Sequence, residues 1–173
     1  MKRYFLLLCC MLPTAGVHAA QTCKPESIPA STSDSQLVDN GDGTITDSKT
    51  GLMWKKCLEG LSGNNCESGA TGSFTWQSAL QQPDIVNNSG GFAGHKDWRL
   101  PNINELVSII EEQCSAPAIN LSRFPNTPSS GVRSGSPYTG YSDNAWYVNF
   151  AYGFSYFNPR DDGSAVRLVR GGQ

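Results

Sequence analysis

The stretch DWRLPNINEL, Asp97 to Leu106, decides the fold of this chain of 173 residues. Asn102 and Glu105 stand three residues apart, which is the spacing at which each side chain bonds the backbone amide of the other at the start of a helix. We therefore predict a helix from Ile103 to Gln113. Its apolar face consists of Ile103, Leu106, Val107 and Ile110.

Trp98 and Arg99 precede this helix at the end of a predicted strand, and Pro101 supplies the turn between them and the helix. A large apolar ring beside an amphipathic helix belongs in the core, so we expect Trp98 to be buried between the helices and a sheet. We expect Arg99 to make a structural ion pair or to bond carbonyl groups rather than to bind a ligand.

The chain before this stretch begins with short strands. Leu37 to Thr46 predicts a β-hairpin around a turn at Gly41 to Gly43, and residues 52–54 predict a third strand. Thr75 is a good N-cap for a helix. We expect Pro83 to end or kink that helix, because proline lacks the amide hydrogen that the helix needs.

Beyond Cys114 the chain alternates loops and strands, and the prolines within residues 115–139 prevent a long helix there. Val166 and Leu168 alternate with Arg167, which predicts one buried face and one solvent-facing side. The whole pattern predicts an α+β fold. The antiparallel strands expected in this part are Trp146–Phe150, Gly153–Phe157 and Ala165–Arg170.

The first twenty residues predict secretion. Lys2 and Arg3 precede an apolar run from Tyr4 to Leu12, and Ala19 and Ala20 suit cleavage, which is the order of a secretory signal peptide. The apolar run is well short of the ~20 residues that span a membrane. We therefore expect no membrane span and a location in the periplasm, at the cell surface or outside the cell.

Four cysteines remain after cleavage, and they allow three disulfide pairings. The Gly, Ser and Asn residues between Cys57 and Cys66 favour a local loop closed by a disulfide, which leaves Cys23 to pair with Cys114. A zinc site is disfavoured because no Cys-x-x-Cys pair exists and secreted chains form disulfides.

Charge excludes one class of function. The full chain has a net charge of −2, and the loss of Lys2 and Arg3 with the signal brings it to about −4. A uniformly basic binder of polyanions is excluded, and no nucleic-acid partner is expected. The charge is uneven, because the part after Cys114 has five arginines, no lysine and only three acids.

The residues give little support to an enzyme. His95 is the only histidine after cleavage, so a multi-histidine metal site is impossible and a Ser-His-Asp triad would depend on it alone. Asp97 and Glu105 suit a turn and a helix cap better than a catalytic pair. We expect no enzymatic activity, no cofactor and no metal.

Two segments invite a calcium interpretation, and neither fits well. In an EF-hand frame set by Gly43, the first and twelfth ligand positions fall on Val38 and Lys49, which supply no side-chain oxygen. The segment Gln82 to Asp84 matches a tripeptide that galactose-binding C-type lectins use, but those lectins place it in the long loop after the second helix. We interpret the first segment as a solvent-facing hairpin turn.

Nine aromatic residues crowd the interval from Tyr138 to Phe157, interleaved with Asn and Ser. Only one face of each strand can enter the core, so several of these rings should lie at the surface, although packing of most of them in a β-core is an equal alternative. Exposed Tyr and Trp beside amide groups are typical of adaptable binding surfaces. The candidate ligand-binding residues are Tyr141, Asn144, Tyr147, Asn149, Tyr152, Tyr156, Asn158 and Arg160.

These motifs together resemble the Lcl C-terminal domain family, named for a Legionella collagen-like adhesin. The resemblance implies a C-type-lectin-like fold, related to that of formylglycine-generating enzymes, with a twisted antiparallel sheet, two flanking helices and a long loop region. It also implies the same cysteine arrangement, and the adhesin suggests sulfated glycans as a ligand class. One segment departs from the family, because Gly131 to Ser136 lacks the Tyr/Phe-Trp-Ser-Ser run that members often carry. The matching segments are residues 39–44, 50–54, 75–76, 97–102, 105–106, 117–119, 124–128 and 166–172.

The sequence therefore predicts a signal peptide at residues 1–20, an extended segment at 21–36 held mainly by Cys23, and one domain at 37–173. The predicted function is non-enzymatic recognition of an extracellular glycan or protein, related to adhesion. The alternative is a structural module that assembles with other proteins of the bacterial envelope and has no soluble ligand.

Overall fold

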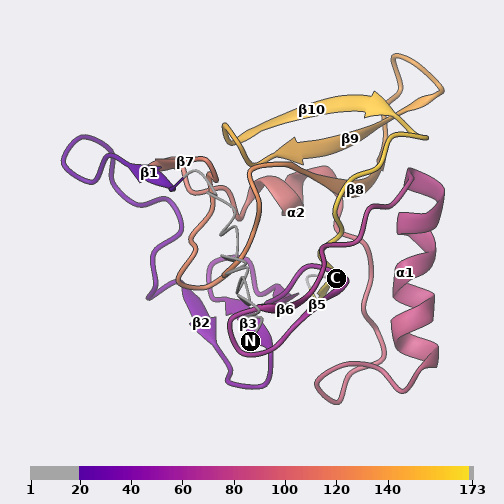
Figure 1. Ribbon diagram of the computed structural model, residues 1–173, viewed down its shortest axis with the longest axis horizontal. Helices are drawn as coiled ribbons and strands as arrows, with labels where there is room; N and C mark the ends of the chain where they lie inside the picture. The colour runs from indigo at the N-terminus through magenta and orange to yellow at the C-terminus, as the bar shows by residue number, and fades with distance from the viewer. Residues whose placement is uncertain (1–19, 172–173) are drawn as a thin grey trace, which may run out of the picture.

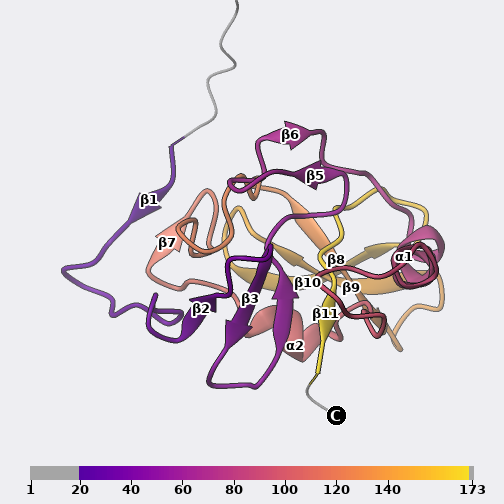
Figure 2. The same ribbon diagram turned by 90° about the horizontal axis from the view of Figure 1, so that it is seen from below.

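A computed structural model describes residues 20–171, so the predicted signal peptide lies, except for Ala20, outside the described residues. The helices are α1 (Trp76–Asn88) and α2 (Ile103–Val107). The fold is α+β: the sheets are small and antiparallel, α2 packs against a three-stranded sheet, and α1 lies at one side of the molecule (Figure 1, Figure 2). Within residues 20–171 no helix is both long and apolar enough to cross a bilayer.

A four-stranded sheet in the order β11-β4-β3-β2 forms the lower part of the molecule in Figure 1. Its strands are β2 (Leu37–Asp39), β3 (Thr44–Asp47), β4 (Met53–Lys55) and β11 (Val169–Arg170). The predicted hairpin is confirmed, with Val38 opposite Thr46 and Ile45 opposite Trp54 in the next pair of strands. Gly43 lies at φ +88°, and a Cβ there would stand 2.8 Å from the ring of Phe92, so the turn requires glycine.

A three-stranded sheet in the order β10-β9-β8 forms the upper part. Its strands are β8 (Gly131–Pro137), β9 (Asn144–Asn149) and β10 (Phe154–Pro159). The last two strands are close to prediction. β8 was not among the predicted strands: its backbone pairs with β9 although Gly, Ser and Pro are poor strand formers.

Two further pairs of short strands complete the fold. β1 (Thr22–Cys23) pairs with β7 (Cys114–Ser115), and β5 (Leu61–Ser62) pairs with β6 (Ser68–Gly69).

Helix α1 starts where the sequence predicts, with the Thr75 hydroxyl accepting a hydrogen bond from the Ser78 amide. It does not end at Pro83 but runs on to Asn88, so an end at that proline was a wrong expectation. Proline removes one backbone bond from a helix, and burial of Pro83 against the body of the domain holds the helix together across that gap.

Helix α2 has the predicted capping box: Asn102 accepts from the Glu105 amide at 2.9 Å, and Glu105 accepts from the Asn102 amide at 2.8 Å. The helix ends at Val107, however, and the predicted extension to Gln113 is wrong. The amide of Glu111 bonds the Ala118 carbonyl instead of continuing the helix.

Trp98 is buried, as expected, in a small core cluster with Leu100, Val166 and Leu168. Its indole N–H donates to the Phe92 carbonyl at 3.0 Å. The predicted structural ion pair is confirmed as well: the two terminal nitrogens of Arg99 donate to the two carboxylate oxygens of Glu105 at 2.8 and 2.6 Å.

The main core lies between the two larger sheets and α2.

The segment Ala165–Arg170 was predicted as an alternating strand, and only Val169–Arg170 belongs to a sheet. Arg167 was expected on a solvent-facing side, but it is 1% exposed. Its guanidinium donates to the carbonyls of Lys55 and Lys56 and to the Thr127 hydroxyl, and it lies over the Phe124 ring. The alternation failed because these carbonyls provide an interior site for a charged side chain.

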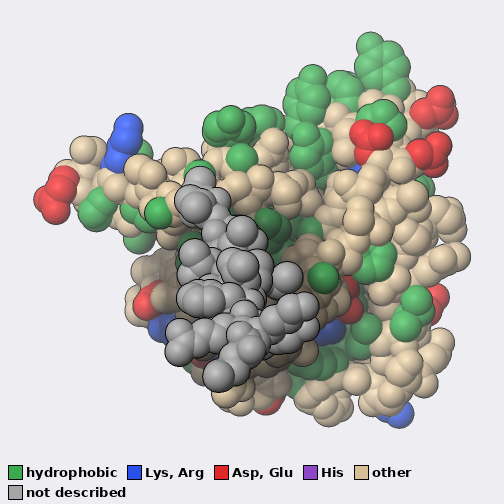
Figure 3. All heavy atoms as spheres, viewed as in Figure 1, with side chains coloured by type: hydrophobic (Ala, Val, Ile, Leu, Met, Phe, Trp, Pro, Cys, Tyr) green, Lys and Arg blue, Asp and Glu red, His purple; other side chains and the backbone are tan. Residues whose placement is uncertain are grey.

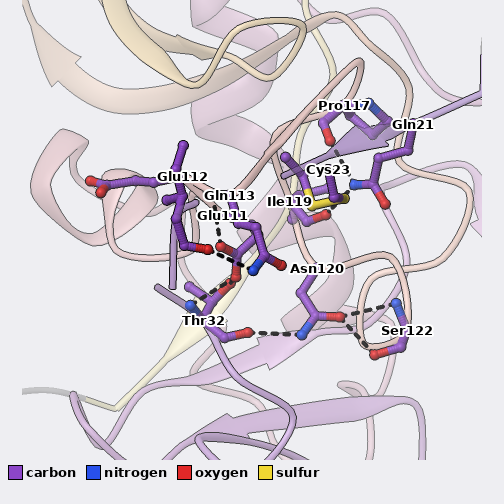
Figure 4. The surroundings of a disulfide bond; sticks show 12 residues. Gln21, Cys23, Thr32, Glu111, Glu112, Gln113, Pro117, Ile119, Asn120 and Ser122 are labelled. Carbon is purple, nitrogen blue, oxygen red and sulfur yellow. Dashed lines mark hydrogen bonds between the residues drawn. A yellow bond between two sulfur atoms is a disulfide. The ribbon is translucent and has the colours of Figure 1, made fainter. Parts of the chain in front are cut away.

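The disulfides are Cys57–Cys66 and Cys23–Cys114, which confirms the favoured pairing. The second bond holds the N-terminal segment beside the chain after α2 (Figure 4). We expected Cys23 to be the main attachment of that segment, and this expectation is wrong. The buried Glu111 carboxylate accepts hydrogen bonds from the amides and hydroxyls of both Ser31 and Thr32.

Candidate recognition surface

Strand β10, at the edge of its sheet, carries exposed aromatic rings together with the turn before it and the β8–β9 connection. Tyr152 is 73% exposed, Tyr156 51% and Phe154 44%, while Tyr141, on the β8–β9 connection, is 64% exposed. Figure 3 shows hydrophobic side chains gathered along the upper edge of the molecule, over β10 and that connection.

The rings form a continuous series that we call the aromatic row. Its members, in spatial order, are Tyr152, Phe154, Tyr156, Phe157, Tyr138 and Tyr141. The planes of Tyr152 and Phe154 are 7° from parallel with centroids 6.0 Å apart, and those of Phe157 and Tyr138 are 6° from parallel at 3.9 Å. Each such pair contributes ~0.5–1.5 kcal/mol beyond its buried area, so the row is a fixed arrangement rather than a set of independent side chains.

The contact between Tyr156 and Phe157 shows how the row is placed relative to the outer edge of β10. Tyr156 and Phe157 are consecutive in β10, yet their rings stack at 4.8 Å. Consecutive side chains leave a strand on opposite faces, so these rings meet around the outer edge of β10, where β9 does not block them. The row therefore covers part of the strand edge that would otherwise be open to pairing.

The structure divides the predicted ligand-binding residues into two groups. Tyr141, Tyr152 and Tyr156 lie exposed in the row. The others are half-buried, and the side chains of three of them contact other parts of the protein, so the structure does not bring all eight together at the surface. These half-buried residues are Asn144, Tyr147, Asn149, Asn158 and Arg160.

The contacts of the second group are structural. The Asn158 side-chain oxygen accepts from the Arg133 guanidinium, and that of Asn149 accepts from the Ala151 amide at 2.9 Å in the turn before β10. The guanidinium of Arg160 lies 4.2 Å from the ring centroid of Trp76 at the start of α1.

Phe154, Phe157 and Tyr138 belong to the row but were not among the predicted site residues. Alternation places Phe154 on the same face as Tyr152 and Tyr156, so it could have been included, and assigns only Phe157 to the core. The missing signal was that β10 is an edge strand, because an edge allows rings from both faces to reach solvent, and strand order cannot be read from this sequence.

The positive charge of the C-terminal part is engaged elsewhere in the protein. Arg133 and Arg167 are 0% and 1% exposed, and burial lowers the pKa of Arg133 and lowers that of Arg167 to about 9. Arg170 forms a two-bond ion pair with Asp97, and hydrogen bonds from Arg170 lower the pKa of that carboxyl group.

The exposed charges beside the row are negative. Arg123 faces Asp34 at 3.5 Å, on the far side of the domain core from β10, and Arg160 covers Trp76. Three exposed aspartates lie in the connections at the Tyr141 end of the row, and Figure 3 shows acidic side chains at that end. They are Asp143, Asp161 and Asp162.

The residues considered for chemistry have structural contacts. The Glu105 carboxylate accepts hydrogen bonds from Arg99 and from the Asn102 amide. Burial raises the pKa of Glu105, but these hydrogen bonds bring that pKa below its ordinary value. His95 is half-buried in a tight turn closed on Phe92. Among residues 20–171 no three His, Cys, Asp or Glu side chains gather where they could hold a metal ion.

The two calcium candidates have simple structural places. The Asp42 carboxylate accepts from the Thr44 amide at 3.0 Å within the β2–β3 turn, and Asp39 pairs with Lys56 at 2.8 Å. The tripeptide Gln82 to Asp84 lies inside α1, where a helix backbone separates its side chains from the long loop region.

Comparison with known proteins gives one positive result. No curated protein matches the chain closely enough to count as a relative. The family model described as the Lcl C-terminal domain matches residues 43–170, which include the three-stranded sheet, all of the four-stranded sheet except β2, both helices and the whole aromatic row. The chain belongs to the Lcl C-terminal domain family.

Proposed function

We propose that this protein is a secreted or cell-surface domain that recognises an extracellular glycan or protein without catalysing a reaction, and that the aromatic row binds the ligand. The observation that carries the proposal is the exposure of four large rings in one connected series. Covering apolar surface gains ~25 cal/mol per Å², so a ligand that covers these rings gains free energy that folding has left unused. Connected apolar patches of this kind mark interaction sites.

The compartment and the fold class support the proposal. Two disulfides indicate an oxidising environment, which is extracellular or periplasmic. We assign the fold to the C-type-lectin-like class on the basis of its two helices, its antiparallel sheets and the long irregular segment from Glu111 to Ser130. Related lectin-like domains display ligand-binding residues in their C-terminal region, where the aromatic row lies.

The absence of catalysis is part of the proposal. An acid or base in catalysis must be free to exchange a proton with its substrate. Asp97, Glu105 and Glu111 are instead held as charged acceptors by Arg170, by Arg99 and by the N-terminal segment. These contacts explain the three carboxylates by structural roles alone.

The proposal is tested with a variant that removes three exposed rings: Tyr152→Ser, Phe154→Ser and Tyr156→Ser. Arg160 stays, because its contact with Trp76 holds α1. The matched control carries Val38→Ser and Ile85→Ser, two exposed apolar side chains outside the row. The chain, secreted from a bacterial host, is applied to a glycan array with and without calcium and to purified extracellular-matrix proteins.

We expect the ring variant to lose the binding that wild type and control share, while it still unfolds in one cooperative transition, at a melting temperature lowered by the loss of three ring pairs. A folded ring variant that binds as wild type does would move the site away from β10. If wild type binds no glycan and no matrix protein, the alternative of a structural envelope module is favoured.

A further inference from the structure

The charges around the aromatic row restrict what can bind there. All five arginines after Cys114 are buried or engaged with another group, as described above. The exposed side chains at one end of the row are Asp143, Asp161 and Asp162. A sulfated or otherwise anionic ligand would meet like charges and find no free guanidinium in the described chain beside the row, so its approach is opposed.

The size of the surface restricts the partner as well. A large aromatic side chain buries ~150–250 Å², so four rings that are 44–73% exposed present roughly 350–600 Å². A stable protein interface buries about 800 Å² on each partner. The row also covers the outer edge of β10, through the stack of Tyr156 on Phe157, where a partner strand would have to pair.

The shape and chemistry of the row suit a sugar chain. The faces of pyranose rings carry C–H groups that pack on aromatic rings. Tyr152 and Phe154 are stacked on each other and Tyr156 stands at 90° to Phe154, so the exposed rings offer successive sugar units surfaces of different orientation. Tyrosine hydroxyls and aspartate carboxylates are hydrogen-bond partners for sugar hydroxyls. A row along one strand fits a linear ligand better than a compact one.

We infer that the ligand of the aromatic row is an uncharged polysaccharide, bound by stacking along β10 and not by charge. This inference rests on the proposed function and names the ligand class of the same surface. It differs from the sulfated ligands that the family resemblance suggests, because the arginines that such ligands need are turned into the fold.

The test measures binding of the secreted chain to three probes. They are neutral oligosaccharides (glucan, mannan and chitin series), heparin as a sulfated polysaccharide, and a basic lysine-arginine peptide. Each is measured with wild type, with the single variants Tyr152→Ala and Phe154→Ala, and with Ile85→Ala as control. Salt is varied from about 0.1 M to about 1 M, over which the Debye length falls from ~10 Å to ~3 Å.

We expect at least one neutral series to bind. Its affinity should change less than about twofold over the salt range. The affinity should fall at least about tenfold in each ring variant and stay unchanged in the control. Heparin should bind at least about tenfold more weakly than that series. Ring-dependent, salt-sensitive binding of heparin or of the peptide would overturn the inference and leave the proposed function standing. If wild type binds none of the neutral series, the inference is overturned. If wild type and the ring variants bind the probes equally, the proposed function is overturned as well.

Discussion

Replacement of Trp98 by alanine tests whether the small core cluster beside α1 stabilises the domain. The indole is 2% exposed and packs with Leu100, Val166 and Leu168. It meets the Phe92 ring edge-to-face at 5.9 Å and donates a hydrogen bond to the Phe92 carbonyl. The substitution therefore leaves a cavity, removes an aromatic pair and leaves a carbonyl group without its donor.

Core substitutions of Trp or Phe by Ala cost ~3–5 kcal/mol, and the lost hydrogen bond places this site toward the upper end. In a domain of this size each kcal/mol lowers the melting temperature by roughly 2–4 °C, so we expect a loss of roughly 6–20 °C. The backbone bonds between Trp98 and the Asn87 side chain remain, so the loss is confined to the ring.

The assay is thermal unfolding of the oxidised, secreted chain, followed by near-ultraviolet circular dichroism. Trp98→Phe is the companion variant, because it removes the N–H donor while it keeps an aromatic ring and most of the ring volume, and it should cost clearly less than the alanine variant. An alanine variant that is secreted normally and melts within a few degrees of wild type would refute the core assignment. Equal losses in both variants would refute the division into packing and hydrogen bonding.

Two further predictions concern buried charges. The Glu111 carboxylate is desolvated, which raises its pKa, but hydrogen bonds from Ser31, Thr32 and their neighbours bring the pKa below the ordinary value of 4.5. The stabilising effect of the charged carboxylate is therefore present above about pH 4.5 and is lost as the pH falls through the lower pKa of the folded state. In urea titrations, Glu111→Gln should lower the free energy of unfolding by ~1.5–3 kcal/mol at neutral pH and by progressively less in acid. A difference that stays constant with pH would contradict this. Arg167→Lys should destabilise the domain by ~3 kcal/mol or more in the same assay, because one ammonium group cannot replace the planar guanidinium that bonds two carbonyls and Thr127. An unchanged midpoint of the urea transition would show that these bonds contribute little.

The parts of the fold that were predictable depend on neighbours in the sequence. The capping box needs only Asn102 and Glu105, and the β2–β3 hairpin needs only its glycine turn and the strands beside it. The Cys57–Cys66 loop is also local. Each of these features was correct because residues a few positions apart provide all of its hydrogen bonds or its covalent bond.

The parts that failed depend on residues far away in the sequence. Helix α2 stops early because the following chain bonds Ala118 and the N-terminal segment around Ser31, which lies about eighty residues earlier. Arg167 is buried because carbonyls near Lys55 provide its bonds. Phe157 was left out of the site because only strand order shows that β10 is an edge, whereas Phe154 follows the alternation of Tyr152 and Tyr156 and could have been included.

The contrast between buried arginines and exposed rings is the strongest reason to connect β10 with binding. Transfer of a charged guanidinium into the core is costly unless it is bonded, and the terminal nitrogens of the buried Arg133 and Arg167 donate to protein oxygens. Full burial of an aromatic side chain stabilises by ~1.5–3 kcal/mol, and this domain leaves much of that gain unused at Tyr152, Phe154 and Tyr156. Serine or threonine at Phe154 and Tyr156 would satisfy the same strand pairing, since β10 bonds β9 through its backbone, and Tyr152 lies in the turn outside that pairing. Folding alone therefore does not explain the rings, whereas a partner that stacks on them does.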